Sequence, residues 1–119
     1  MSDAKQPRKN LRKHVAFPVK VSESSPKAAH ACVAYSFGAG GLGFEGGISL
    51  WVGATVRLEF TLPGEQRKMV VDANVRSCDP VKKESLAEPR FRIGVQFVGL
   101  SPAEEMHFGN YMSGSTVLF

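Results

Sequence analysis

The stretch YSFGAGGLGF, residues Tyr35 to Phe44, places four glycines around a single alanine, with an aromatic residue at each end. Strand-like apolar runs precede and follow it. Glycine permits backbone conformations and close approaches that other residues do not. This glycine corner, residues 38–43, is therefore either a tight bend or a platform that a ligand can approach closely.

Around the corner, alternation of apolar and polar residues predicts six strands. The alternation is clearest at 54–62, where Val56, Leu58, Phe60 and Leu62 point one way and the residues between them the other. The same period predicts strands at 14–21, 42–45, 68–78 and 90–98, and a run of small, mostly apolar residues with weak alternation predicts another at 28–35. The segments SESSPK at 22–27 and PGEQ at 63–66 are rich in turn-forming residues. The pattern indicates antiparallel strands joined by short connections.

The end of the chain changes to a helical period. Ser101 and Glu104 form a capping box with Pro102 at the first helical position, which predicts a helix over about 101–113. Phe108, Tyr111 and Met112 make one stripe that should face the strands. We therefore expect a mainly β fold, a six-stranded antiparallel β-barrel or closed sandwich with a C-terminal α-helix.

Single residues carry further expectations. Trp51 is expected in the core or at its rim, because aromatic side chains mostly bury area. Pro18 cannot donate a ladder hydrogen bond and should mark a strand edge or a bulge. Cys32 and Cys78 belong to no metal-binding pair and should be reduced thiols rather than a disulfide or a zinc site.

Composition and length indicate a single globular domain. Of the 119 residues, 43% are hydrophobic and 22% are charged, which is ordinary for a soluble protein. No apolar run reaches the roughly 18 residues needed to cross a bilayer. The first residues lack the hydrophobic segment of a secretory signal. We therefore expect a cytoplasmic protein without membrane insertion.

Positive charge is concentrated at the N-terminus. Residues 1–20 hold six basic side chains and one acidic one, whereas the other 99 residues hold nine basic and ten acidic side chains. Residues 1–13 are thus predicted to form a flexible basic arm ahead of a folded unit at 14–119. Such an arm attracts the phosphates of a nucleotide, a nucleic acid or a membrane.

The chain shows no arrangement typical of catalysis. His14, His30 and His107 lack metal-ligand spacing, and neither a nucleophile elbow nor a Walker loop is present. We expect no enzyme activity, no metal and no cofactor. The aromatic residues of the strands occupy positions that are predicted to face inward, so specific nucleic-acid binding on an open sheet face is not expected.

The arm and the glycine corner can together form an anion site. Arg8 and Arg12 are four residues apart and could converge on one ligand if the arm folds back. Arginine grips phosphate or a guanine edge with two hydrogen bonds. The corner offers backbone N–H groups and the Ser36 hydroxyl. This combination suits a nucleotide that carries both phosphate and guanine.

These residues resemble a PilZ domain over nearly the whole chain. The matching segments, in family order, are RKNLR at 8–12, VAFPVKV at 15–21, GGLGF at 40–44, VGATVRLEFTLP at 52–63 and FRIGVQFVGLSPAEE at 91–105. The resemblance implies a six-stranded antiparallel barrel with a C-terminal helix that binds cyclic di-GMP. Two motifs carry that binding, RxxxR before the first strand and [DN]xSxxG at the corner before the third.

The first motif is complete and the second is degenerate. Arg8 and Arg12 match the two arginines, which by the family's pattern contact phosphates and guanine. In the second motif Ser36 stands where Asp or Asn belongs and Gly38 where Ser belongs, while Gly41 matches the final Gly. The ligand-binding residues implied by the resemblance are Arg8, Arg12, Ser36, Gly38, Gly40 and Gly41.

The degenerate motif lowers the expected affinity. Each lost contact to a base edge is worth about 1–3 kcal/mol, so two losses would cost roughly two to four decades of affinity. Compensation would have to come from Tyr35, Phe37 or an outward side chain such as Arg76.

Three functions remain open at this point. The first is a cyclic di-GMP receptor in which the ligand orders the arm, and the ordered arm contacts an effector protein. The second is a degenerate PilZ interaction module that binds a protein partner and no cyclic di-GMP. The third is a basic arm that binds nucleic acid nonspecifically, with an affinity that falls steeply with salt.

Overall fold

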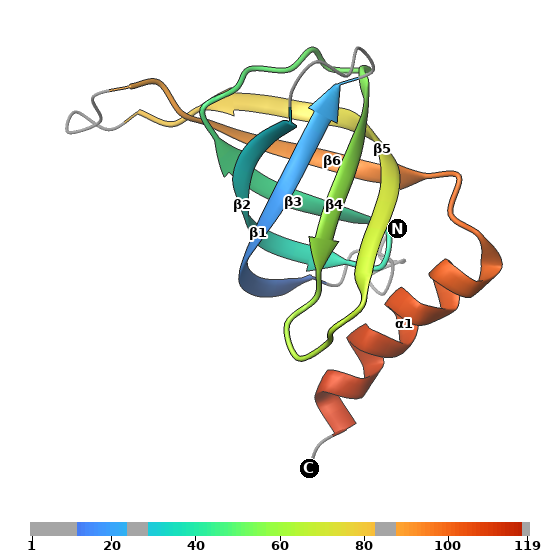
Figure 1. The fold of residues 1–119 in the computed structure, drawn as a ribbon. Helices are drawn as coiled ribbons and strands as arrows, with labels where there is room; N and C mark the ends of the chain where they lie inside the picture. The colour runs from blue at the N-terminus through green and yellow to red at the C-terminus, as the bar shows by residue number, and fades with distance from the viewer. Residues whose placement is uncertain (1–11, 24–28, 83–87, 118–119) are drawn as a thin grey trace, which may run out of the picture.

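The computed structural model describes residues 12–23, 29–82 and 88–117, with side chains up to residue 113. Six strands and one helix make up this part of the chain (Figure 1). They are β1 (Lys13–Glu23), β2 (Ala29–Gly38), β3 (Gly41–Gly46), β4 (Thr55–Thr61), β5 (Lys68–Pro80), β6 (Phe91–Val98) and α1 (Pro102–Val117). The strands and the helix agree with the periods in the sequence, with ends that differ by a few residues.

The strands close into an antiparallel barrel in the order β1-β2-β3-β6-β5-β4, with β4 paired to β1. Each strand therefore has two neighbours, and the sheet has no free edge. The expected six-stranded barrel with a C-terminal helix is confirmed. One consequence is that β3 pairs with β6, so that Gly43 lies opposite Gly94 although 51 positions separate them in the chain.

The core fills the barrel with the inward residues of every strand, and α1 adds to it from one end of the barrel (Figure 1). Phe108 of α1 is fully buried, and its ring packs edge-on against Phe37 at 5.4 Å between centroids. The rings of Phe60 and Phe97 lie 6.3 and 5.2 Å from it. Because Phe37, Phe60 and Phe97 come from three different strands, the helix joins the barrel through one shared aromatic cluster.

Polar contacts fix the beginning and the middle of α1. The predicted capping box is present: Ser101 N–H donates to Glu104 Oε1 at 2.8 Å, and Glu104 N–H donates to Ser101 Oγ at 3.1 Å. Further along, the Tyr111 hydroxyl donates to the Pro63 carbonyl at 3.1 Å, and His107 Nε2 lies 2.9 Å from Glu65 Oε1. Both contacts hold the helix against the hairpin that connects β4 and β5.

The expectation that Trp51 lies in the core or at its rim is wrong. Its side chain is 85% exposed, and the neighbouring Leu50 is buried in its place. The reason is a tight turn, in which Ala54 N–H donates to the Trp51 carbonyl at 3.0 Å and Gly53 has a φ of +97°. This turn carries Trp51 out of the strand pattern and away from the core.

The expectations for Pro18 and the cysteines have different outcomes. Pro18 does not mark a sheet edge, because β1 pairs on both sides. It follows a bulge between His14 and Phe17, and pairing with β4 begins only at Val19, so a missing N–H is tolerated there. Cys32 and Cys78 are free thiols as expected, and burial raises the pKa of Cys32. Among the described residues, no helix has the length and apolar character of a membrane span.

Candidate ligand-binding site

Four of the six predicted ligand-binding residues line one pocket. Arg12, Gly38, Gly40 and Gly41 all border a cavity of about 740 Å³ on the outside of the barrel. Ser36 stands beside it and accepts a hydrogen bond of 3.4 Å from Arg12 Nη1. Arg8 lies outside the described residues. Arg12, the second arginine of the RxxxR motif, and the glycine corner therefore border the same pocket.

The glycine corner is a tight turn between β2 and β3 that is tied to β6. Phe97 N–H donates to the Gly40 carbonyl at 2.9 Å. The described glycines with positive φ are Gly53, Gly64 and Gly99, so the corner does not depend on left-handed backbone. Close approach is the requirement at Gly41, where a Cβ would overlap the Val95 carbonyl oxygen. At Gly40 a Cβ would meet nothing within 4 Å and would point into open space.

Adjacent glycines therefore make a matched pair for mutation. Gly41→Ala is expected to lower the free energy of unfolding by about 2 kcal/mol, because strand β6 must move to make room for the methyl group. Gly40→Ala is expected to change it by less than about 1 kcal/mol, since the methyl group causes no overlap. Urea unfolding followed by circular dichroism measures both. Equal losses in the two variants would contradict the close approach at position 41.

The remaining wall of the pocket comes from β5, β6 and α1. Arg76 of β5 donates through Nη1 to Gln96 Oε1 of β6 at 2.8 Å. Next to them Gly94 faces Ser77, whose hydroxyl oxygen would be only 2.8 Å from a Cβ at position 94. Glu105 of α1 contributes a carboxylate. The described part of the pocket thus carries two guanidinium groups, one carboxylate and a floor poor in side chains.

Sequence reasoning did not assign Ser77, Gln96 or Glu105 to the site. The alternation along β5 and β6 predicts that Arg76 and Gln96 point outward. Only the pairing of β3 with β6 and of β6 with β5 brings them to the corner. Arg76 lines the pocket and fits its expected compensating role. Phe37 does not, because its side chain is fully buried in the core.

Tyr35 lies outside this pocket. Its ring covers the backbone at Gly43, where a Cβ would be 3.0 Å from Cζ of the ring. The Arg92 guanidinium lies over the same ring at 4.8 Å from its centroid. Tyr35 and Arg92 border a second hollow of about 410 Å³, which shares only Ser77 with the first. In this arrangement Tyr35 does not compensate for the degenerate motif.

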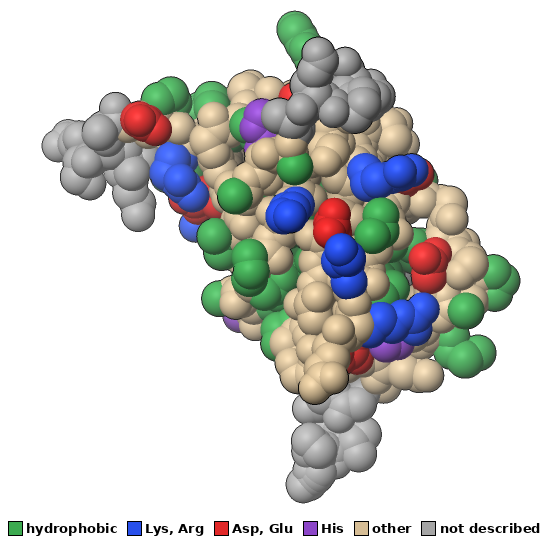
Figure 2. Space-filling model, in the orientation of Figure 1, with side chains coloured by type: hydrophobic (Ala, Val, Ile, Leu, Met, Phe, Trp, Pro, Cys, Tyr) green, Lys and Arg blue, Asp and Glu red, His purple; other side chains and the backbone are tan. Residues whose placement is uncertain are grey.

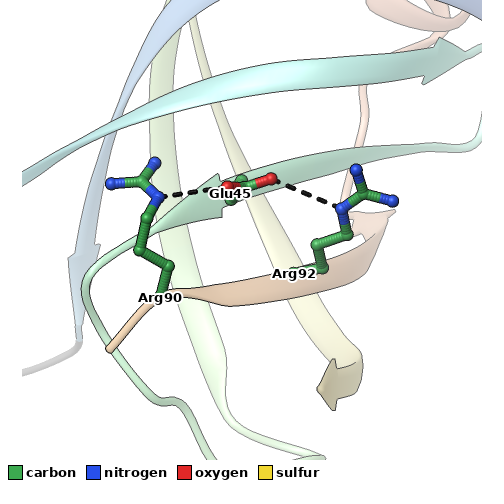
Figure 3. A network of polar contacts seen from close by, with 3 residues as sticks. All are labelled: Glu45, Arg90 and Arg92. Carbon is green, nitrogen blue, oxygen red and sulfur yellow. Dashed lines mark hydrogen bonds and ion pairs between the residues drawn. The ribbon is translucent and has the colours of Figure 1, made fainter. Parts of the chain in front are cut away.

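Arg90 and Arg92 are bound by a carboxylate on the neighbouring strand. Glu45 of β3 lies between them, with Oε2 3.0 Å from Arg90 Nε and Oε1 3.3 Å from Arg92 Nε (Figure 3). The hydrogen bond from Arg90, followed by that from Arg92, lowers the pKa of Glu45 below its ordinary value of 4.5. These two arginines are therefore partly neutralised, whereas Arg12 and Arg76 have only uncharged hydrogen-bond partners among the described residues.

This lowered pKa predicts a pH dependence. Because the folded-state pKa lies below the unfolded one, the ionised Glu45 stabilises the fold above about pH 4.5, and that contribution is lost as pH falls through the folded-state pKa. Glu45→Gln should therefore cost about 0.5–1 kcal/mol at pH 7 and much less at about pH 3. Urea unfolding at the two pH values tests this, with the exposed Glu88→Gln as control. A cost that is the same at both pH values would contradict it.

The face of the barrel seen in Figure 2 carries charges of both signs. Lys and Arg side chains lie next to Asp and Glu side chains there, without a continuous basic patch. Among the described residues, two ion pairs join β4 to β5: Arg57 Nε lies 3.1 Å from Asp72 Oδ1, and Lys68 Nζ lies 2.8 Å from Glu59 Oε2. These two exposed cations are therefore partly neutralised by carboxylates on the neighbouring strand.

Comparison with solved structures supports the fold. The Bacillus subtilis inhibitor of motility (MotI/DgrA) superposes with a TM-score of 0.73 at 21% identity, over 94% of this chain and 52% of that one. The PilZ domain of YcgR from Escherichia coli, solved with cyclic di-GMP, gives 0.71 at 16% identity, over 92% and 91%. MrkH of K. pneumonia in its apo state gives 0.75 at 13% identity, over 96% and 52%.

At these low identities, the superpositions show a shared fold. The chain spans about half the length of the inhibitor of motility and of MrkH. No curated protein sequence matches it significantly. The family model for the PilZ domain, however, matches residues 6–114, which include the RxxxR motif, all six strands and most of α1. With this match and the closed barrel, the chain belongs to the PilZ domain family.

Proposed function

We propose that this protein is a receptor for cyclic di-GMP and that the nucleotide binds in the pocket between Arg12 and the glycine corner. The observation that carries the proposal is the position of the Arg12 guanidinium, which lines the same cavity as Gly38, Gly40 and Gly41. The volume of about 740 Å³ lies within the range of roughly 300–1,000 Å³ that is usual for small-molecule sites. Solved PilZ relatives include complexes with cyclic di-GMP.

Each part of the site has a role that follows from its chemistry. Arg12 grips a phosphate or the edge of guanine, and Arg8 supplies the second arginine of the RxxxR motif. Arg76 adds a cation from the far wall of the pocket. The glycine corner admits the ligand close to the backbone, where no side chain at Gly40 blocks it. Ser36 holds Arg12 at the edge of the pocket through the 3.4 Å contact.

Signalling to a partner would begin at Arg12 and Lys13, the described residues of the arm. Arg12 contacts Ser36, while the next residue, Lys13, places its Nζ 4.9 Å from the ring centroid of Tyr111 on α1. The arm therefore touches the ligand pocket and the helix at consecutive residues. We propose that the bound nucleotide orders the arm against the barrel and α1, and that this composite surface contacts an effector protein. The nucleotide can shift the equilibrium towards the ordered arm only by the difference between its binding free energies for the ordered and the disordered state.

Calorimetric titration of the full chain with cyclic di-GMP tests the proposal. The expected result is saturable binding together with a rise in melting temperature, because a ligand at 100 times its Kd stabilises the folded state by about 2.7 kcal/mol. Cyclic di-AMP, which has the same phosphate ring and different bases, is the control for nonspecific attraction by the arm. The proposal fails if millimolar cyclic di-GMP produces neither heat nor a thermal shift.

One observation favours a second candidate, an interaction module that does not bind the nucleotide. Trp51 and its neighbour Val52 are both exposed, at 85% and 65%, in the connection between β3 and β4. Adjacent exposed apolar side chains are a feature of protein-binding surfaces. In that case a partner would bind equally well with and without cyclic di-GMP, and Trp51→Ala would weaken the complex while Arg12→Ala would not.

A further inference from the structure

Glu105 is the one carboxylate among the described residues that line the proposed cyclic di-GMP pocket. It lies in the first turn of α1, where its backbone N–H donates to the Ser101 carbonyl at 2.9 Å. The neighbouring Glu104 is the residue whose side chain closes the cap. The carboxylate of Glu105 is therefore not required to begin the helix, and Glu105 is an exposed residue that lines the pocket.

This carboxylate has no cationic partner within the described chain, although two arginines line the same cavity. Arg12 is bound to Ser36 and Arg76 to Gln96. By contrast, two carboxylates on the barrel pair with arginine: Asp72 with Arg57, and the part-buried Glu45 with Arg90. Glu105 thus keeps both carboxylate oxygens available to a ligand in the pocket.

An unpaired carboxylate does not favour the phosphates of the ligand, because like charges repel. It does suit the base. Guanine presents two donors side by side on its Watson–Crick edge, the N1–H and the N2 amino group, and a carboxylate accepts two parallel hydrogen bonds. Adenine presents an acceptor at N1 and would place its lone pair against the carboxylate. A carboxylate at this position therefore separates guanine from adenine.

We propose that Glu105 binds the Watson–Crick edge of a guanine base and is the residue that determines the base specificity of the pocket. The proposal rests on the proposed function. It also addresses the degenerate second motif, in which Ser36 and Gly38 leave the corner without a carboxylate or amide side chain. The acceptor for the base comes instead from α1, so binding of the base contacts the helix as well as the barrel.

A cycle of ligand and protein changes tests the contact. The ligands are cyclic di-GMP, cyclic di-IMP, whose hypoxanthine lacks the N2 amino group, and cyclic di-AMP. The proteins are the full-length wild type, Glu105→Ala and Glu105→Gln. Glu23→Ala serves as a control with the same charge change, because Glu23 lies at the end of β1 that is remote from Arg12. Affinities are measured by calorimetry, and circular dichroism compares the helix content of the variants.

Wild type is expected to prefer cyclic di-GMP to cyclic di-IMP by about 10-fold, as the loss of one charge-assisted hydrogen bond implies. Glu105→Ala should bind cyclic di-GMP roughly 10- to 100-fold more weakly and should no longer distinguish the two ligands. Glu105→Gln keeps an acceptor for only one of the two guanine donors, so its affinity for cyclic di-GMP should lie between those of wild type and Glu105→Ala. Cyclic di-AMP should bind Glu105→Ala no more weakly than it binds wild type. Glu23→Ala should behave as wild type.

The outcomes separate this inference from the proposed function. If wild type binds cyclic di-GMP and Glu105→Ala keeps the same preference over cyclic di-IMP, Glu105 does not contact the base and the inference is overturned alone. If wild type binds none of the three ligands, the proposed function and the inference fall together. A uniform loss for all three ligands in Glu105→Ala would assign Glu105 a structural role and would also overturn the specific contact.

Discussion

Arg12→Ala is expected to weaken the binding of cyclic di-GMP by about 100-fold, since removing one member of a charged hydrogen-bonded pair at a binding site costs roughly 2–5 kcal/mol. Arg12 is the described arginine of the RxxxR motif, and its guanidinium lines the pocket beside the glycine corner. The other described cation of the arm, Lys13, does not line this pocket and lies over the ring of Tyr111. The affinity is measured by calorimetric titration with cyclic di-GMP.

The matched control is Arg57→Ala. It removes the same charge from an exposed arginine of β4 that pairs with Asp72 and does not line this pocket. It is therefore expected to leave the affinity within about twofold of wild type, because an exposed charge outside the site acts only through the screened field of the protein. Arg8→Ala tests the second arginine of the motif in the same way. Equal losses in Arg12→Ala and Arg57→Ala would show that only net charge matters, and would remove Arg12 from the site.

Phe108→Ala is expected to lower the free energy of unfolding by about 3–5 kcal/mol, the usual cost of truncating a buried phenylalanine. Phe108 is fully buried, and its ring packs against Phe37, Phe60 and Phe97. The truncation leaves a cavity at the junction between α1 and the barrel. Urea and thermal unfolding measure the loss, and near-ultraviolet circular dichroism reports the aromatic packing.

Met106→Ala is the control on the same helix. Its side chain is 66% exposed, and alanine has at least as high a helix propensity, so the change should stay within about 0.5 kcal/mol. Gly109 weakens the helix interior by roughly 1 kcal/mol relative to alanine, which makes α1 dependent on its packing. If Phe108→Ala unfolds with wild-type stability, α1 does not contribute its ring to the barrel core.

Local patterns explain why much of the fold could be predicted. The alternation at Val56, Leu58 and Phe60 determines which face of β4 is buried, since side chains of a strand alternate between its two faces. The capping box at Ser101 and Glu104 begins the helix through contacts within four residues. Trp51 shows the limit of this reasoning, because a turn at Gly53 moved it out of the strand pattern into solvent.

Half of the candidate site also follows from local sequence. Arg12 and the glycine corner are recognisable because each lies within a short motif, and the structure places them around one cavity. The far wall is different. Arg76, Gln96 and Glu105 belong to β5, β6 and α1, and no spacing along the chain relates them to the corner.

The amino-acid sequence by itself determined the strands, the capped helix and the position of the arginine motif before β1, because these depend on residues close together in the chain. Only the tertiary structure decided which strands became neighbours. Closing the barrel with β3 beside β6 and β6 beside β5 carried Arg76 and Gln96 to the glycine corner, and seating Phe108 in the core brought Glu105 there with α1. Those contacts join residues more than 30 positions apart, and they form because every inward face must be buried at once.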